Sequence, residues 1–252
     1  MSKLIWLTDP HVVEPGRDWP AGVDPLAGLR RCLDEVRVLH ADAERIVVSG
    51  DLVQLRNTKA YGLLESELDS LGTPYRLMVG NHDDRAAFSR TFRGPRATGF
   101  IQSAEEIAGT RLLYLDTVAQ DGNHHGELCP VRMEWITRHV EAAGDKPLLM
   151  FLHHPPMDIG VPALDRLKLR NAAPLAGLVS RRRAPTHLFF GHLHRNVCGL
   201  WAGHPFAALK STHVQYELEM TGSRLVLSKE PPGYAVVSFD GDGIVVNFRD
   251  VT

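Results

Sequence analysis

Phe189-Phe190-Gly191-His192-Leu193-His194 places two histidines, one residue apart, directly after an apolar run. This arrangement is typical of metal ligands presented at the end of a β-strand. Four other polar clusters also follow short apolar runs: Asp9 and His11, Gly50-Asp51, Gly80-Asn81-His82-Asp83, and His153-His154. Open α/β sheets bind ligands beyond the carboxyl ends of their strands, so we predict that these five clusters meet in one crevice.

Predicted strands and helices alternate through the first third of the chain. Short apolar runs predict strands at residues 4–7, 46–48 and 75–79. Leucines and valines at helical spacing predict helices between them, at residues 25–41 and 58–71. The order β-α-β-α-β is typical of a sheet with crossover helices.

The remaining elements predict an α/β core that closes with antiparallel strands. Further helices are predicted at residues 85–91, 131–143 and 174–182. Further strands are predicted at residues 100–107, 111–115, 147–152, 187–190, 205–209, 215–220, 234–239 and 244–248. Turn residues at 108–110 and 240–243 predict hairpins. No repeat or linker is evident, so we expect a single domain over residues 1–252.

Composition and charge restrict the classes of protein to consider. The 252 residues are 44% hydrophobic, and a net charge of -2 predicts no general attraction to nucleic acid or membrane. Cys32, Cys129 and Cys198 lack the C-x-x-C spacing, which favours free thiols in a reducing cytosol. Four apolar residues after residue 3 are too few for a signal peptide, and no run reaches the roughly 18 of a membrane span. We therefore expect a soluble, cytoplasmic protein.

The residue types in the five clusters indicate which ions they would bind. They supply carboxylate, amide and imidazole groups but no thiolate. This set suits Zn, Fe, Mn or Co and argues against a closed structural zinc site. Seven ligands exceed what one tetrahedral ion needs, whereas two ions that share a carboxylate would use them all.

The clusters, in this order, resemble the motifs of the calcineurin-like metallophosphoesterases. Within that superfamily the chain is most similar to the branch of class III cyclic nucleotide phosphodiesterases and glycerophosphodiesterases. The features that suggest this branch are Thr8-Asp9-Pro10-His11 with Pro15-Gly16, His153-His154-Pro155-Pro156, and Ser211-Thr212. The resemblance covers residues 9 to 194 and is looser beyond them. It implies a four-layer αββα fold, in which two packed mixed sheets are flanked by helices.

The resemblance also implies a role for each motif residue. One metal ion would be held by Asp9, His11, Asp51 and His194, and the second by Asp51, Asn81, His153 and His192, with Asp51 bridging. A hydroxide between the ions would be the nucleophile, since bound metal lowers the pKa of water toward roughly 7. His82 is not a ligand in the family, and we assign it to stabilising the phosphoryl oxygens or protonating the leaving alkoxide. Asp51 and His82 are therefore the expected catalytic residues.

Other polar residues near the motifs have several interpretations. His154 either supports the site through a hydrogen bond or contacts substrate, and His213 could line the substrate pocket. His124 and His125 fall in a polar loop that we expect to be exposed, although it could rim the crevice. Asp83 is expected to cap or orient its neighbours, and Asp116 to end a strand.

Three positions differ from what is common in these enzymes. Val79 replaces a frequent proline, and Gln54-Leu55 occurs where an acidic residue often follows Gly-Asp-Leu. None of them is a principal ligand, so we expect metal binding with altered support around the ligands.

The expected function is hydrolysis of a small phosphodiester, with a cyclic nucleotide such as 3',5'-cAMP favoured and a glycerophosphodiester next. A phosphomonoesterase, protein phosphatase or nuclease on the same scaffold is the enzymatic alternative, and no long basic stretch supports the nuclease. A non-catalytic, metal-loaded binding module is the alternative from another class. We expect neither nucleic-acid polymers nor membranes as partners, and the sequence leaves the oligomeric state open.

Overall fold

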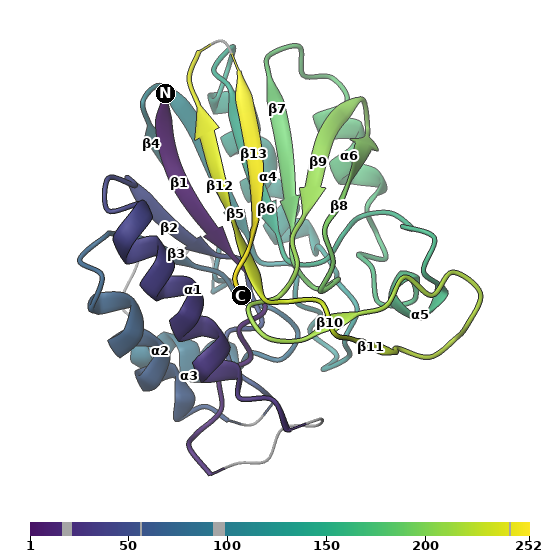
Figure 1. Ribbon diagram of the computed structural model, residues 1–252. Coiled ribbons are helices and arrows are strands. Elements are labelled where there is room, and N and C mark those ends of the chain that lie inside the picture. The colour runs from purple at the N-terminus through teal and green to yellow at the C-terminus, as the bar shows by residue number, and fades with distance from the viewer. Residues whose placement is uncertain (17–21, 56, 93–98, 242) are drawn as a thin grey trace.

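Two mixed β-sheets, packed face to face, form the centre of the protein in the computed structural model (Figure 1). The structure describes residues 1–16, 22–55, 57–92, 99–241 and 243–252. The first sheet has the strand order β13-β12-β1-β2-β3, and the second has the order β4-β5-β6-β7-β9-β8. A two-stranded ribbon of β10 and β11 lies outside both sheets.

Each sheet combines parallel strands with antiparallel ones. In the first sheet β1, β2 and β3 are parallel, with β12 and β13 antiparallel at one side. In the second, β5, β6, β7 and β9 are parallel, with β4 and β8 antiparallel at the edges. The bounds are β1 Ser2–Leu7, β2 Arg45–Val48, β3 Tyr75–Leu77, β12 Gly233–Phe239, β13 Ile244–Asp250, β4 Ser103–Ile107, β5 Thr110–Leu115, β6 Leu148–Leu152, β7 Thr186–Phe190, β8 Val197–Trp201, β9 His204–Ala208, β10 Gln215–Tyr216 and β11 Leu227–Ser228.

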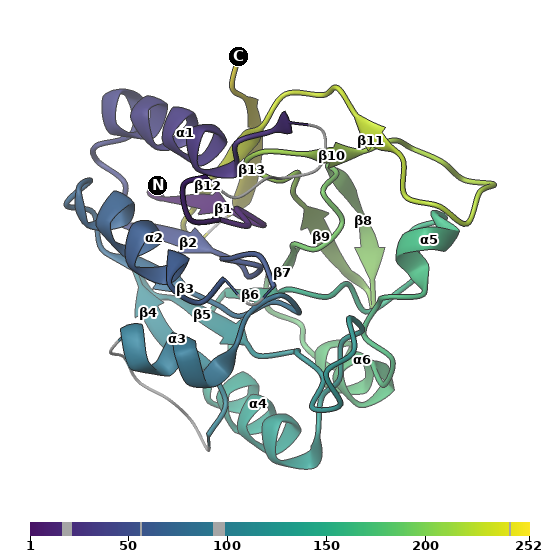
Figure 2. The ribbon, with the colours of Figure 1, turned by 90° about the horizontal axis from the view of Figure 1, so that it is seen from below.

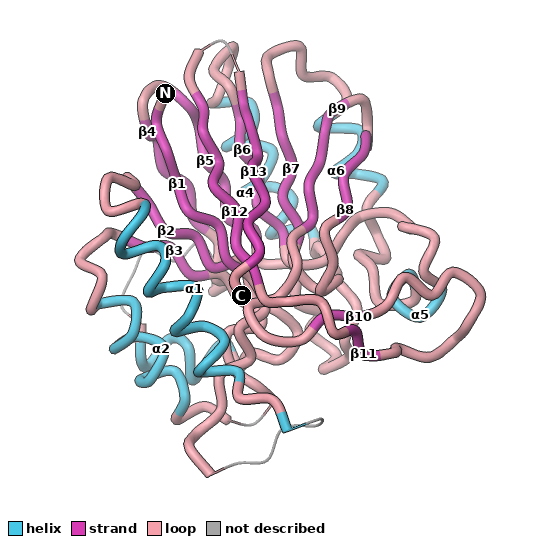
Figure 3. The backbone as a smooth tube through the Cα atoms, in the orientation of Figure 1, coloured by secondary structure: helices cyan, strands magenta, loops and turns pink. Residues whose placement is uncertain are grey.

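Helices cover the outer face of each sheet, as Figures 1 and 3 show. Helices α1 (Pro25–Leu39), α2 (Ala60–Asp69) and α3 (Arg85–Thr91) pack on the first sheet. Helices α4 (Pro130–Ala142) and α6 (Ala173–Val179) pack on the second. The short helix α5 (Pro162–Asp165) lies beside the β10–β11 ribbon. The result is the four-layer αββα arrangement, so the expected fold class is confirmed.

Alternation along β1 shows how the sequence specifies three separate cores. Ile5 and Leu7 point to the helices α1 and α2, whereas Leu4 and Trp6 point to the second sheet. Side chains alternate across a strand, so an entirely apolar strand is expected wherever both of its faces are buried. The unbroken run of residues 4–7 therefore reflects a central strand in a four-layer protein.

The start of α1 illustrates how local sequence sets an element. The Asp24 side chain accepts a hydrogen bond from the amide of Ala27, and Pro25 occupies the first helical turn. Both features favour helix initiation at this point. The buried face of α1 includes Leu29, Leu33 and Val36, as the helical spacing predicts.

Several predicted boundaries were wrong. The strand predicted at residues 215–220 extends only over Gln215–Tyr216, and the one predicted at residues 100–107 begins at Ser103. Strand β8, helix α5 and strand β11 were not predicted, because their exposed or very short segments show no clear periodicity. The hairpin between β12 and β13 is confirmed by its ladder, although residue 242 at its tip lies outside the described residues.

Helices long and apolar enough to cross a bilayer do not occur in the described part of the chain.

Candidate active site

The five predicted clusters follow β1, β2, β3, β6 and β7, strands that lie near the centre of the view in Figure 2. Ligand atoms from these clusters lie close together. Parallel central strands deliver their carboxyl ends to the same edge of a sheet, and the two sheets are aligned. We name the residues gathered here the floor: Asp9, His11, Asp51, Asn81, His153, His192 and His194.

Two carboxylates lie at the centre of the floor. Oδ2 of Asp51 is 3.4 Å from Nε2 of His11 and 3.4 Å from Nε2 of His153. Oδ1 of Asp9 is 3.5 Å from Nε2 of His194 and 3.8 Å from Nε2 of His153. Atoms that bind one transition-metal ion at about 2.1 Å lie roughly 3–3.5 Å from each other. These separations therefore fit donors grouped around cations, with Asp51 reaching two histidines on different sides.

Several inward-facing atoms of the floor are buried without a hydrogen-bond partner among the described residues. They are Oδ1 of Asp9, Oδ1 of Asn81, Nε2 of His153 and Nε2 of His192. Leaving such groups unpaired is costly, so a cluster of them that faces one space indicates a ligand there. Carboxylate oxygens and imidazole nitrogens are donors that suit transition-metal cations, and the residues present fit them.

The outward-facing atoms of the same side chains are held by the protein. Nδ1 of His153 donates to the carbonyl of Ser49 at 2.9 Å, and Nδ1 of His194 donates to the carbonyl of Val214 at 2.7 Å. Oδ2 of Asp9 accepts from the hydroxyl of Thr8 at 2.7 Å and from the amide of His192 at 2.9 Å. These bonds fix each ring so that Nε2 faces the site, which is how metal-ligating histidines are oriented.

Charges within the floor shift the pKa values of its members. Burial by itself raises the pKa of Asp9, but His153 and His194 outweigh it and bring this pKa down to about 2. Burial by itself lowers the pKa of His153, but Asp51 and Asp9 raise it to about 9. Burial brings the pKa of His11 down to about 3. The Asp9 carboxylate is thus ionised near neutral pH and His11 is a neutral donor, as metal binding requires, whereas His153 would give up its proton when a cation binds.

Five floor residues have a left-handed backbone, which few non-glycine residues adopt. The φ angles are 51° at Asp9, 42° at His11, 50° at Asp51, 70° at His192 and 49° at His194. Such residues carry local strain and persist only where the surrounding structure determines them. The tight turns direct the side chains inward immediately after the strands end.

Two motif glycines leave room for the floor. A Cβ added to Gly50 would lie 2.5 Å from Nδ1 of His153, and one added to Gly80 would lie 2.2 Å from Oδ1 of Asp51. Both distances are shorter than the contacts that real Cβ atoms make, so each loop can approach the ligand side chains this closely only if the residue is glycine.

Asp83 ties two of the loops together. Its carboxylate accepts from the amides of Leu52 and Gly80 at 3.1 and 2.8 Å and from the hydroxyl of Tyr61 at 2.9 Å. Burial and the charge of Asp51 raise the pKa of Asp83 to about 7. The expectation that Asp83 orients its neighbours is confirmed.

His82 lies at the mouth of the floor and is fixed by Gln54. Oε1 of Gln54 is 2.5 Å from Nδ1 of His82 and 3.2 Å from Nδ1 of His11. An amide oxygen only accepts, so both imidazoles donate from Nδ1 and direct Nε2 toward the site. Sequence reasoning noted Gln54 as a departure but missed this contact, which depends on two loops meeting in space.

The loop after β5 corrects one expectation. His125 was predicted to be exposed, but it is buried. Bridges join the neighbouring Gly126 to Val118 within the loop and to Leu169 in the segment after α5. His124 lines the cleft, and its Nδ1 is 2.8 Å from Nδ2 of Asn81. Nothing in the sequence indicated that His124 would contact Asn81.

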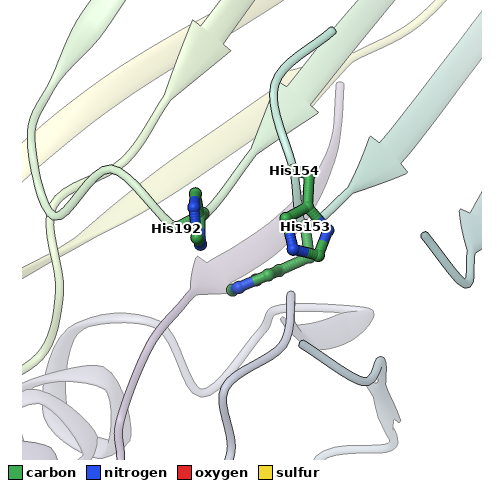
Figure 4. Close-up of side chains that lie close together, drawn as sticks. All are labelled: His153, His154 and His192. Atoms are coloured by element: carbon green, nitrogen blue, oxygen red, sulfur yellow. The ribbon is translucent and has the colours of Figure 1, made fainter. Parts of the chain in front are cut away.

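His154 and His213 are buried beside histidines of the floor, and a ring nitrogen of His154 lies within 4.8 Å of those of His153 and His192. Nδ1 of His154 is 2.8 Å from the hydroxyl of Thr117, and its ring centroid is 4.8 Å from that of His192 (Figure 4). The ring of His213 is 5.3 Å from that of His11. Both are buried, and neither belongs to the described residues that line the cleft.

Above the floor opens a cleft of ≈ 380 Å³. One side carries the polar groups of the floor together with Gln54, His82 and His124. The other side is apolar and comes from α5, the turn after it and the β10–β11 ribbon. Its lining residues are Leu164, Leu167, Val214, Tyr216, Leu225 and Leu227, with Leu55 at the rim. A small molecule of mixed polar and apolar character fits this cleft.

Comparison with known proteins identifies the class that this fold and site define. The sequence profile of the calcineurin-like phosphoesterases matches residues 2–196. The chain therefore belongs to the calcineurin-like phosphoesterase family, and it is a hydrolase of phosphate esters. Divalent metal ions are the cofactors that the histidine and aspartate clusters suit.

Curated relatives and a solved structure resemble the whole chain. It is 38% identical over 97% of its length to a probable cyclic nucleotide phosphodiesterase of Rhodopseudomonas palustris, of which 91% is covered. It is 27% identical over 96% of its length to the 3',5'-cyclic adenosine monophosphate phosphodiesterase CpdA of Escherichia coli (86% covered). It is 28% identical over 91% of its length to the glycerophosphodiester phosphodiesterase GpdQ of Enterobacter lignolyticus (84% covered). A dimetal phosphatase from Danio rerio shares the fold, with a TM-score of 0.73, 13% identity, and coverage of 100% of this chain and 96% of that one.

Proposed function

We propose that the protein is a two-metal phosphodiesterase that hydrolyses a small phosphodiester, with 3',5'-cyclic nucleotides as the favoured substrates. The floor carries this proposal, because four of its buried ligand atoms, on Asp9, Asn81, His153 and His192, lack a hydrogen-bond partner among the described residues and lie among the carboxylates and imidazoles that could hold metal ions. The relatives named for cyclic nucleotide hydrolysis support the substrate class. Glycerophosphodiesters are the second candidate, supported by the similarity to GpdQ.

The floor residues divide into two ligand sets in this proposal. Asp9, His11, Asp51 and His194 would hold one ion, and Asp51, Asn81, His153 and His192 would hold the other. Mn, Fe, Zn and Co all accept this combination of imidazole and carboxylate. Bound cations supply a water of lowered pKa and neutralise charge on the phosphate.

His82 is the protein group placed to act on the substrate. Because Nδ1 of its ring donates to Gln54, only Nε2 is free to meet a phosphoryl oxygen or the leaving alkoxide. Nε2 is 3.9 Å from Oδ2 of Asp51, so it lies next to the proposed reaction centre. We assign these roles to the protonated form of His82, which carries a hydrogen on each ring nitrogen: Nε2–H donates to the phosphoryl group and gives its proton to the departing oxygen, and the neutral ring that remains still donates from Nδ1 to Gln54. Asp51, as the bridging carboxylate, completes the catalytic pair.

His154 and His213 take supporting roles in this proposal rather than the substrate contacts expected from the sequence. Each ring lies beside the ring of a proposed ligand, His154 beside His192 and His213 beside His11. A second layer of this kind fixes ligand rings in place.

The proposal extends to the setting in which the enzyme works. A single catalytic domain is supported by the core that both sheets share. Work in the reducing cytosol is supported by Cys32, Cys129 and Cys198, which are all free thiols. Small substrates rather than nucleic-acid polymers are supported by the net charge of -2. A homo-oligomer is compatible with all of these features.

Parallel hydrolysis assays test the proposed function. Protein stripped of metal and reloaded with Mn²⁺ is given bis(p-nitrophenyl) phosphate, p-nitrophenyl phosphate, 3',5'-cAMP and glycerophosphoethanolamine. We expect metal-dependent turnover that prefers the diesters and is fastest with 3',5'-cAMP among the two natural compounds. Preference for the monoester would replace the proposal with a phosphatase. Absence of turnover with every metal tested would leave a metal-loaded binding module.

A further inference from the structure

The apolar side of the cleft is built from two segments that are far apart in the sequence. Tyr216 of β10 pairs with Leu227 of β11, and these two side chains line the cleft together with Leu225 of the segment before β11. Leu164 of α5 and Leu167 of the following turn face the same cleft. We name these five residues the apolar wall.

The apolar wall is continuous with the floor. The ring of Tyr216 lies 5.0 Å from the ring of His194, so the wall begins beside a proposed metal ligand. A phosphate bound at the floor would therefore place its attached groups against the wall. Leu225 and Leu227 are 40% and 43% exposed, and exposed apolar side chains that rim a polar site mark a binding surface.

The charge of the cleft restricts what the wall can recognise. Among its described lining residues Asp51 is the one carboxylate, and there is no lysine or arginine. A second phosphate or a carboxylate on the substrate would find no cationic side chain, and a quaternary amine would find no acidic partner beyond the floor. A flat, uncharged and largely apolar group matches these surroundings.

Resting on the function proposed above, we propose that the apolar wall binds the nucleobase of a cyclic nucleotide while the phosphate occupies the floor. Nucleobases have large apolar faces, whereas the alcohols of a glycerophosphodiester are small and polar. The wall thus favours the cyclic nucleotide over the glycerophosphodiester. It reads the base by shape and apolar contact, because the side chains of the wall offer a single hydrogen-bonding group, the hydroxyl of Tyr216.

A substrate without a base isolates the contribution of the wall. The wild-type enzyme is assayed with 3',5'-cAMP and with methyl riboside 3',5'-cyclic phosphate, which has the same reacting group. We expect kcat/KM to be about tenfold or more higher for 3',5'-cAMP, the usual scale for apolar contacts in a binding pocket. Equal values for the two substrates would overturn the proposal.

Two wall variants test its two halves separately. Leu227→Ser alters the ribbon and Leu167→Ala alters the turn after α5, so failure of one variant to fold does not remove the test. We expect each to reduce the ratio of the two kcat/KM values by about threefold to tenfold. Leu218→Ser is the matched control, because Leu218 is a ribbon leucine that is 57% exposed and lies outside the cleft lining. This control variant should leave the ratio unchanged. If both wall variants lowered kcat/KM by the same factor for the two substrates, the proposal would be overturned.

Base preference provides a second test of the same surface. An apolar wall discriminates weakly between purines, so kcat/KM for 3',5'-cAMP and 3',5'-cGMP should agree within about tenfold. A difference of about 10³-fold or more would indicate polar readout of the base and would overturn recognition by the wall. Turnover of bis(p-nitrophenyl) phosphate but of neither cyclic phosphate would overturn the base site and leave a phosphodiesterase. Absence of turnover with all substrates would overturn the proposed function as well.

Discussion

The floor and the apolar wall meet where His194 approaches Tyr216, but they are built in opposite ways. The floor is buried, follows central strands of two sheets and is fixed by hydrogen bonds on the outer side of its ligands. The wall depends on a ladder of two residues and leaves Leu225 and Leu227 exposed. Strained turns are tolerable only where many contacts determine them, so the chemistry is placed on the rigid part. Substrate selection is left to loops, where a substitution disturbs little else.

The largest effect is expected from breaking the floor at Asp51. One of its oxygens approaches both His11 and His153, so the carboxylate serves both proposed ions. In Asp51→Asn we expect kcat/KM for bis(p-nitrophenyl) phosphate to fall by about 10³-fold or more. Elemental analysis of the dialysed protein should find fewer than two bound ions per chain.

An exposed carboxylate provides the control for this experiment. Asp34 on α1 pairs only with Arg37 at the surface, so Asp34→Asn should retain both metal and activity. If Asp51→Asn kept two ions and more than about a tenth of the activity, the bridging role would be wrong.

His82→Ala tests the group at the border between the floor and the substrate. Proton donation matters most for a poor leaving group, so we expect kcat for 3',5'-cAMP to fall by about 10²-fold. With p-nitrophenolate, which departs without a proton, the loss should be below about tenfold. Equal losses for the two substrates would restrict His82 to binding the phosphoryl group, and unchanged turnover of 3',5'-cAMP would remove it from the mechanism.

Gln54→Leu tests how much the fixed orientation of the His82 and His11 rings contributes to activity. The variant removes the oxygen that accepts from Nδ1 of both His82 and His11 but conserves most of the side-chain volume. Loss of such an orienting partner typically costs about tenfold in activity, and we expect this decrease in kcat for 3',5'-cAMP. Gln54→Glu restores an oxygen acceptor and should stay within about threefold of the wild type. A Gln54→Leu enzyme with wild-type kcat would show that the ring positions are set by other contacts.

Most of the floor could be predicted because its determinants are local in sequence. Most of the ligands follow a strand that is buried on both faces, and such strands appear as unbroken apolar runs such as residues 46–48. Asn81 is the exception, because it follows the half-buried edge strand β3. The turn after each run then places its polar residues at a strand end. The same runs, separated by amphipathic helices, made the α/β class and the β-α-β-α-β succession of the first third of the chain predictable.

The wall and the supporting contacts could not be predicted, because they arise from tertiary structure. The β10–β11 ribbon has too few paired residues to show alternation, and it is held in part by Arg166 donating to the carbonyl of Ser223. His125 is buried in a loop that bridges to the segment after α5, and Gln54 meets His82 across two loops. No periodicity or motif in one sequence reports contacts of this kind.

The smallest effect on stability is expected from replacing a leucine of the apolar wall by serine. Leu225 is 40% exposed, so Leu225→Ser removes little buried area and should lower the melting temperature by less than about 1 °C. Because we propose that it contacts the substrate's base, the variant should raise KM for 3',5'-cAMP about threefold and affect kcat less. Val48→Ser, at a buried position of β2 just before the floor, is the matched change and should lower the melting temperature by about 5 °C or more, since a core side chain is lost. Equal decreases in melting temperature in the two variants would mean that the wall is part of the folded core. The contrast between a rigid, buried floor and an exposed wall would then be wrong.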